Sequence, residues 1–131
     1  MKVTILAIAI SLLCFVTPVH AKANCPQWEP LMRKYGLPVK DFSYIAYRES
    51  GCRIKAINAR FDKHGNVTWT LNKNGSIDRG LFQINSVHKD TVKKLCKGDL
   101  DTLLHVDCNM TVAKYLYDRY GLTPWNMVVK P

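Results

Sequence analysis

Two acidic residues, Glu49 and Asp78, have settings in which carboxyl groups do chemistry. Glu49 continues an i, i+3, i+4, i+7 pattern begun by Phe42, Ile45 and Ala46, so we expect it on the apolar side of a helix. A carboxyl group there is either paired or keeps its proton, and a protonated carboxyl can act as a general acid. Asp78 follows in a polar, turn-rich segment. One acid in an apolar setting and one in a polar setting are typical of glycosidic-bond cleavage.

The helix that would carry the first acid is predicted at residues 41–50. Asp41 suits its N-cap, and Gly51 suits the left-handed residue that ends a helix. Residues 59–81 have a different character, because short runs of β-branched and aromatic residues alternate there with turn-forming residues. This alternation predicts a small antiparallel sheet of two or three strands, with the second acid in or beside the last strand.

Helical patterns dominate the rest of the chain, which predicts an α+β domain that is mainly α. Further helices are expected at residues 27–35, 87–95, 100–105 and 108–120. Apart from the two acids, we expect Trp28 and Trp125 in the core, Trp69 in a segment beside the cleft in which the acids would lie, and His88 and His105 at the surface.

The first residues have the pattern of an export signal. A charged start precedes an unbroken apolar run, which Pro18 and His20 interrupt too soon for a comfortable membrane span. Small residues near Ala21 suit a cleavage site, so we predict a signal peptide at residues 1–21 and one domain at 22–131. An uncleaved anchor helix is the alternative. A cleaved signal predicts a secreted or periplasmic protein with no membrane-spanning segment after its removal.

Four cysteines remain after the predicted signal, an even number that indicates two disulfides in an exported domain. They are Cys25, Cys52, Cys96 and Cys108. Four cysteines allow three pairings, and the sequence alone does not choose among them. The short loop between Cys96 and Cys108 favours that pair, which leaves Cys25 with Cys52. A zinc site is the alternative, but there is no C-x-x-C pair and no His spaced with a Cys as a ligand. We therefore expect no metal and no cofactor.

The chain is strongly basic. Its 19 Lys and Arg against 10 Asp and Glu give a net charge of +9, and loss of Lys2 with the predicted signal leaves +8. This charge favours a polyanionic partner such as nucleic acid, anionic lipid or the acidic polymers of a bacterial wall. The basic residues are spread through the chain, so charge alone does not choose among these partners.

Three segments resemble the lysozyme-like superfamily and occur in that family's order. AYRESGCRIKAIN at residues 46–58 resembles its Glu-Ser segment. GSIDRGLFQINS at residues 75–86 is similar both to the strand-to-helix segment of animal-type lysozymes and to the Gly-Leu-x-Gln motif of soluble lytic transglycosylases. The N-x-x-x-A-x-Y-L pattern at residues 109–116 resembles a transglycosylase helix motif. The resemblance covers nearly the whole predicted mature chain.

The resemblance implies a disulfide-stapled lysozyme-like fold with a small sheet beside an active-site cleft. It also implies cleavage of the β-1,4 bond between N-acetylmuramic acid and N-acetylglucosamine in peptidoglycan. Glu49 matches the catalytic acid of both branches, and Asp78 matches the second carboxylate of animal-type lysozymes. Gln83 and Asn85 match substrate-contacting positions in the cleft floor. Tyr115 matches a tyrosine that helps to hold the acid and the sugar.

Each of these roles has a structural alternative. Glu49 could cap the end of its helix or pair with Arg48 or Arg53, and Asp78 could cap a turn. Ser50, beside the first acid, is a further substrate-binding candidate that could orient a water, against a purely structural role for its hydroxyl. Gln83 and Asn85 could satisfy backbone groups only, and Tyr115 could belong to the core.

The chain also departs from the family's patterns. Residues 59–74 lengthen the stretch between Glu49 and Asp78 relative to animal-type lysozymes, so Asp78 could match in sequence and stand elsewhere in space. YDRYG at residues 117–121 replaces the Ala-Tyr-Asn-Ala-Gly motif of many transglycosylases, and the cysteine positions differ from the animal pattern. With these departures, the chain resembles a secreted bacterial or phage relative more than an animal enzyme.

The sequence therefore predicts a peptidoglycan glycosidase. Asp78 favours hydrolysis, and the motif at residues 109–116 favours transglycosylation with a 1,6-anhydro product, so both reactions stay open. The predicted partner is peptidoglycan strands, with no nucleic acid, and the chain is expected to be a monomer. The alternatives are a catalytically silent glycan binder of the same fold and a cationic protein that acts on membranes. The presence of Glu49 argues against the silent binder.

Overall fold

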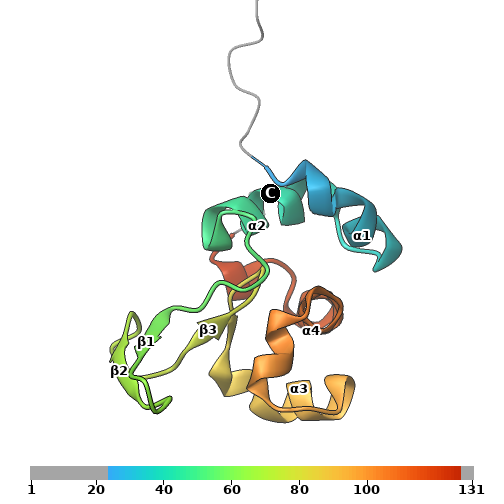
Figure 1. Ribbon diagram of the computed structural model, residues 1–131. Helices are drawn as coiled ribbons and strands as arrows, with labels where there is room; N and C mark the ends of the chain where they lie inside the picture. The colour runs from blue at the N-terminus through green and yellow to red at the C-terminus, as the bar shows by residue number, and fades with distance from the viewer. Residues whose placement is uncertain (1–23, 128–131) are drawn as a thin grey trace, which may run out of the picture.

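The computed structural model describes residues 24–127 of the 131-residue chain, so the predicted signal peptide and its cleavage site lie outside the described residues. Helices α1 and α2 form one part of the molecule, α3 and α4 another, and the short strands a third (Figure 1). In chain order the elements are η1 (Pro26–Trp28), α1 (Glu29–Lys34), α2 (Val39–Ser50), β1 (Ala59–Phe61), β2 (Val67–Thr70), β3 (Asp78–Arg79), β4 (Ile84–Asn85), η2 (Ser86–His88), α3 (Lys89–Cys96), η3 (Leu100–Leu104), α4 (Val106–Tyr120) and η4 (Thr123–Trp125), where η is a 3-10 helix.

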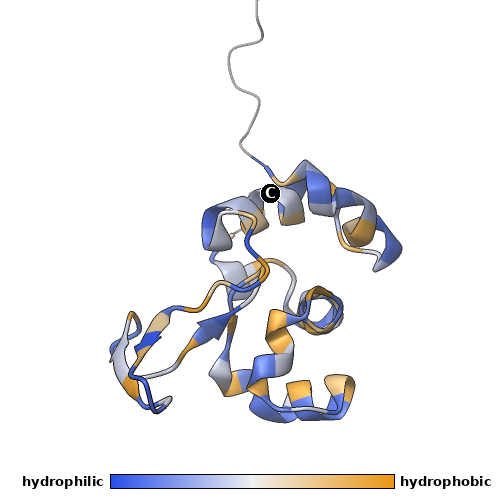
Figure 2. Cartoon of the chain, viewed as in Figure 1, coloured by the Kyte–Doolittle hydropathy of each residue, from blue (hydrophilic) through white to orange (hydrophobic). Residues whose placement is uncertain are grey.

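Helix α2 buries the apolar face that its sequence pattern predicts. Phe42, Ile45 and Ala46 are fully buried, and the ring of Phe42 meets the rings of Phe82 and Trp125 edge to face, with centroids 5.2 and 5.0 Å apart. Apolar and polar residues interleave along the helices in Figure 2, as expected where each helix has one buried face. The core therefore joins α2 to the segment between β3 and β4 and to η4.

The start of α2 differs from the prediction. Pro38 is its N-cap residue, with extended backbone and no side-chain capping bond, so the prediction of Asp41 at the N-cap is wrong. The fixed φ of Pro38 turns the chain directly into the helix, which begins at Val39. Asp41 instead lies in the first turn, where its charge favours the positive end of the helix dipole. The predicted end is confirmed, because Gly51 has a φ of 60°.

The strands form two small antiparallel sheets, β1–β2 and β3–β4, where one sheet of two or three strands was predicted. The two sheets meet at Asn58. Its N–H donates to the carbonyl of Asp78 at 3.0 Å, and its carbonyl accepts from Leu71 N–H at 3.2 Å. A single bridge between Ile57 and Arg79 continues the contact. The chain before β1 thus pairs with two partners in succession, and this divides the sheet.

Two disulfides staple the domain, Cys25–Cys52 and Cys96–Cys108. They match the pairing that the short loop favoured. The first joins the start of the described chain to the residue after Gly51, and the second joins α3 to α4. Such bonds stabilise a small domain chiefly by restricting its unfolded chain.

Candidate active site

A cleft of about 230 Å³ lies between the end of α2, the β3–β4 sheet and η4, and it brings the two predicted acids together. Glu49 reaches it from α2, and Asp78 reaches it from β3. The hairpin β1–β2 accommodates the extra residues between them without removing Asp78 from the cleft. The cleft is lined by Glu49, Asn72, Asp78, Gln83, Ile84, Asn85, His88, Leu116, Pro124, Trp125 and Asn126.

Glu49 is half-buried and ion-paired. Its side chain is 29% exposed, and its Oε1 accepts from Arg48 Nε at 3.0 Å and Nη2 at 2.5 Å. The helical spacing allowed two outcomes for an acid on this face, pairing or retention of a proton, and the structure has the paired one. Arg48 Nη2 also donates to the carbonyl of Trp125, so one guanidinium connects the acid to the opposite wall of the cleft.

Asp78 is held by two neutral amides. Asn72 Nδ2 donates to its Oδ2 at 2.9 Å, and Asn85 Nδ2 donates to its Oδ1 at 2.8 Å. Asn72 Nδ2 also donates to the carbonyl of Ser76 at 3.1 Å, and Asn85 Nδ2 to Ser76 Oγ at 2.9 Å. The carboxylate is therefore fixed from both sides by groups that the adjoining turn anchors.

The turn between β3 and β4, which leads into the cleft residues Gln83 and Asn85, approaches η3 and α4 closely at Gly80. Its φ is 81°, and an added Cβ would lie 2.2 Å from Asn109 Nδ2 and 2.3 Å from the carbonyl oxygen of Leu103, so only glycine fits there. The buried Asn109 amide donates to the carbonyls of Arg79 and Leu103 and accepts from Phe82 N–H. One side chain of α4 thus fixes the backbone on both sides of Gly80.

Gln83 and Asn85 both line the cleft, as the resemblance implied, and both also have structural bonds. Gln83 Nε2 donates to the carbonyls of Ala56 and Gly80, each at 3.0 Å, which supports its backbone φ of 50°. Asn85 Oδ1 accepts from Val87 N–H and caps η2.

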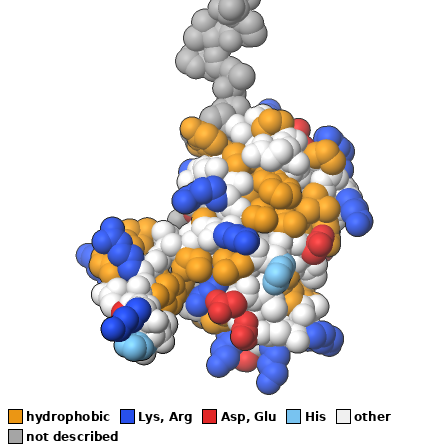
Figure 3. All heavy atoms as spheres, viewed as in Figure 1, with side chains coloured by type: hydrophobic (Ala, Val, Ile, Leu, Met, Phe, Trp, Pro, Cys, Tyr) orange, Lys and Arg blue, Asp and Glu red, His pale blue; other side chains and the backbone are white. Residues whose placement is uncertain are grey.

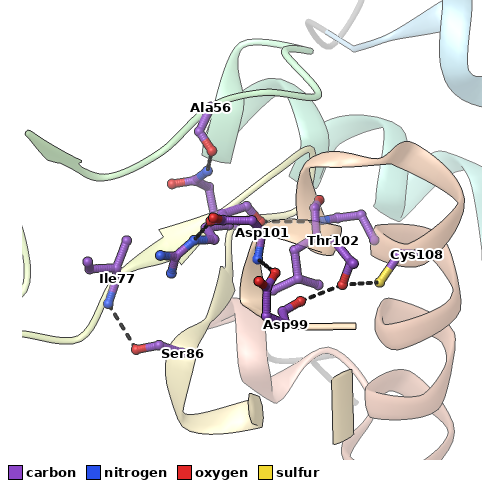
Figure 4. Close-up of polar contacts among 11 residues, drawn as sticks. Ala56, Ile77, Ser86, Asp99, Asp101, Thr102 and Cys108 are labelled. Atoms are coloured by element: carbon purple, nitrogen blue, oxygen red, sulfur yellow. Dashed lines mark hydrogen bonds and ion pairs between the residues drawn. The ribbon is translucent and has the colours of Figure 1, made fainter. Parts of the chain in front are cut away.

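The β3–β4 hairpin is also closed at its base by a bond between the residues that flank it. Ile77 N–H donates to Ser86 Oγ at 3.1 Å, as Figure 4 shows at its lower left. Arg79 Nε donates to Asp101 at 3.1 Å, which joins β3 to η3.

Ser50 and Tyr115 lie outside the residues that line this cleft. Ser50 is buried, and its hydroxyl donates to the carbonyl of Ala46 at 2.9 Å within α2. Tyr115 packs against the core, with the Arg119 guanidinium 4.1 Å from its ring centroid. Their proposed contacts with substrate stay predictions, and the contacts described fit structural roles.

His88 is the clearest functional candidate that the sequence argument missed. It was predicted at the surface, but its side chain is half-buried and lines the cleft, while His105 is exposed. Burial lowers the pKa of His88 from its ordinary value, so its imidazole favours the neutral form. A neutral imidazole offers one donor and one acceptor to a sugar. Its position after Asn85 at the start of a helical turn was the available signal.

The wall of the cleft that η4 forms was also not predicted from the sequence. Trp125 is buried, as predicted for a core residue, and its Nε1 donates to the carbonyl of Phe82 at 3.0 Å. Pro124, Trp125 and Asn126 also line the cleft. Trp69 does not: it is 46% exposed on the β1–β2 hairpin. Only the return of the chain after α4 places η4 opposite Glu49.

Residues 24–127 contain no group of three or more His, Cys, Asp or Glu side chains that could hold a metal ion. Within the same residues, no helix is both long and apolar enough to span a membrane.

Comparison with known families agrees with the fold and the motifs. A family model, the Transglycosylase SLT domain, matches residues 27–130, and the chain belongs to this family. The resemblance to the lysozyme-like superfamily is thereby confirmed.

The chain is also similar to individual curated proteins. It is 32% identical over 109 residues to Protein IpgF of Shigella flexneri and, to the same extent, to Protein IpgF of Shigella sonnei. These alignments cover 83% of this chain and 62% of each relative, so the chain spans less than two thirds of the length of the curated relatives it matches.

Proposed function

We propose that this protein is a lytic transglycosylase that cleaves the β-1,4 bond between N-acetylmuramic acid and N-acetylglucosamine in peptidoglycan. The observation that carries the proposal is the single cleft lined by both Glu49 and Asp78, in a chain that belongs to the Transglycosylase SLT domain family. Glu49 is the general acid and, later, the general base. The chemistry needs no metal and no cofactor.

The reaction balances with one carboxyl group. Glu49 gives its proton to the glycosidic oxygen as the bond to the anomeric carbon of muramic acid breaks, and the sugar becomes oxocarbenium-like. The 6-hydroxyl of the same sugar then attacks that carbon and returns its proton to Glu49. The products are a 1,6-anhydromuramic end and a free 4-hydroxyl, and no water is consumed.

The ion pair with Arg48 has a consequence for this sequence of steps. An ion pair is made by the ionised carboxylate, so the contact has to open before Glu49 can carry a proton. The Arg48 side chain is 34% exposed and has a second partner, the carbonyl of Trp125, on which it can remain. We expect sugar bound between α2 and η4 to separate Glu49 from this guanidinium.

Asp78 supports the proposal as a fixed negative charge. Its two partners are amide N–H groups, which hydrogen-bond to the carboxylate oxygens but do not exchange protons with them. Asp78 therefore suits stabilisation of the oxocarbenium-like sugar and not proton transfer. Gln83, Asn85 and His88 supply amide and imidazole groups for the N-acetyl and hydroxyl groups of the sugars.

Hydrolysis is the second candidate, and the presence of Asp78 in the same cleft favours it. In that reaction a water, in place of the 6-hydroxyl, completes the attack, with Asp78 stabilising or attacking the anomeric carbon. The two disulfides suit an oxidising compartment, so we place the protein outside the cytoplasm, where this substrate lies.

Product analysis tests the proposal. Purified peptidoglycan is digested, and the muropeptides are examined by mass spectrometry. We expect 1,6-anhydromuramic ends, which are lighter than reducing ends by one water. Reducing ends alone would replace transglycosylation by hydrolysis, and the absence of any cleavage would contradict both reactions.

A further inference from the structure

The β1–β2 hairpin has an exposed apolar face that the cleft chemistry does not use. Figure 3 shows hydrophobic and basic side chains together on the lobe at the lower left, the lobe that Figure 1 identifies as β1 and β2. Phe61, Val67, Trp69 and Leu71 are 41–56% exposed. Side chains of this size are normally covered, so their concentration on one hairpin indicates an interaction surface.

Three of the hairpin's residues form one continuous face. Arg60 pairs with Trp69 across the strands, and its guanidinium lies 5.3 Å from the centroid of the indole ring. Leu71 continues the ladder through its bond to Asn58, and by the alternation of side chains it lies on the same side as Trp69. We call Arg60, Trp69 and Leu71 the hairpin face.

The hairpin face is continuous with the cleft. Asn72 follows Leu71 directly, lines the cleft and donates to Asp78. Asn72 lies three residues after Trp69, so their Cα atoms are at most about 11 Å apart. A polymer that leaves the cleft beside Asn72 therefore meets Leu71 and then Trp69.

Charge separates the two surfaces. The cleft is lined by two acids, Glu49 and Asp78, while the hairpin carries the exposed cations Arg60, Lys63 and Lys73. The one acid of the hairpin, Asp62, accepts hydrogen bonds within the turn from the N–H groups of His64 and Asn66. The bond from Asn66 is the main cause of the lowered pKa of Asp62. The cations of the hairpin therefore attract an anionic polymer, whereas the two acids of the cleft do not.

We propose that the hairpin face is a second binding surface for peptidoglycan, which holds the polymer outside the cleft through sugar stacking on Trp69 and pairing of stem-peptide carboxylates with Arg60. The inference rests on the proposed function for its choice of polymer. A lipid surface is less suited, because the charged and polar turn at residues 62–66 forms the tip of the hairpin. A guanidinium beside an aromatic ring suits a ligand with both apolar sugar faces and carboxylates.

The experiment measures binding of the full chain to insoluble peptidoglycan sacculi in a Glu49→Gln background, so that the polymer stays intact. We expect Trp69→Ala and Arg60→Gln each to weaken binding about fivefold, the order of loss expected for one exposed stacking or cation–π contact. Tyr120→Ala removes another exposed aromatic side chain, on α4, and is the matched control that should bind as the parent does. With Glu49 restored, the loss of cleavage should be greater on sacculi than on a short soluble glycan that fills only the cleft.

Three results would overturn the inference. The first is unchanged binding of both hairpin variants to sacculi. The second is an equal loss on the short glycan, which would place the effect in the cleft or the fold. The third is a loss of binding to phosphatidylglycerol vesicles alone, which would identify a lipid surface. Failure of the proposed function is separate, because it leaves the binding assay intact and removes cleavage by the unmodified protein.

Discussion

Two walls of the cleft carry an acid, the end of α2 and the β3–β4 sheet, and they hold their acids in different ways. On the helical wall, Glu49 is held by the charged side chain of its own neighbour, Arg48, which is itself a third exposed. On the sheet wall, Asp78 is held by two neutral amides, those of Asn72 and Asn85, which the adjoining turn also anchors. A pair made by two adjacent, partly exposed side chains can open at little cost, whereas the amide network is fixed from several directions.

This difference assigns different work to the two carboxyl groups. A group that must lose and regain a proton benefits from a partner that can leave. A group that only stabilises developing charge benefits from a fixed position. Substitutions on either wall test this division.

The largest effect is expected from Glu49→Gln. The amide keeps the shape of the side chain and removes the proton donor, so kcat on peptidoglycan should fall about 1,000-fold. The thermal midpoint should change little, because the pair with Arg48 is partly exposed. Release of muropeptides measures the activity, and circular dichroism measures the fold. Activity close to that of the parent would remove Glu49 from the chemistry and favour a protein that acts through charge.

A smaller loss is expected from Asp78→Asn. The change removes a fixed negative charge from the cleft and turns one acceptor of the network into a donor that faces Asn72 or Asn85. We expect kcat to fall about 10- to 100-fold, with the 1,6-anhydro fraction of the products unchanged. Loss of reducing-end products alone would show that Asp78 serves hydrolysis, and a loss as large as that of Glu49→Gln would contradict the division between the walls.

Removing one support of Asp78 should cost less than removing Asp78 itself. Asn72→Ala breaks one bond to the carboxylate and one to the Ser76 carbonyl, and we expect kcat to fall about threefold to tenfold. If Asn72 acts through Asp78, the change should have little further effect in the Asp78→Asn background. Additive losses in this double-mutant cycle would show an independent contact of Asn72 with substrate.

The smallest effect concerns pH and His88 on the sheet wall. Burial lowers the pKa of His88 in the folded protein, so below the ordinary value the unfolded chain binds more protons than the folded one. Stability should therefore fall as the pH decreases from about 6.5 toward the lowered pKa. His88→Gln should reduce this acid-induced drop in the thermal midpoint by about 1–2 °C. Parallel curves for the two proteins between pH 7.5 and 5 would contradict the expected coupling.

Sequence patterns predicted the scaffold of the helical wall well. The spacing of Phe42, Ile45 and Ala46 is a local property of one helix, and Gly51 ends that helix as expected. The predicted N-cap, Asp41, lies about one turn inside the helix, because the helix begins earlier, directly after Pro38. Family membership then confirmed the motif-based resemblance.

The sheet wall was less predictable because its contacts join distant parts of the chain. Whether Asp78 reaches the cleft depends on how residues 59–74 fold, and these form a separate hairpin. The division into two sheets depends on Asn58, which bonds to two segments at once. His88 and Trp125 reach the cleft only through the packing of η2 and η4, which no local periodicity reports.

The peptide groups on either side of Phe82 are satisfied by side chains that come much later in the chain. Asn109 accepts from Phe82 N–H, and Trp125 Nε1 donates to the carbonyl of Phe82, over separations of 27 and 43 residues. As the chain emerges during synthesis, the peptide groups of Phe82, next to the cleft residue Gln83, are made long before these partners are. A chain interrupted after η3 would lack both, so the cleft can become competent only when α4 and η4 have folded onto it.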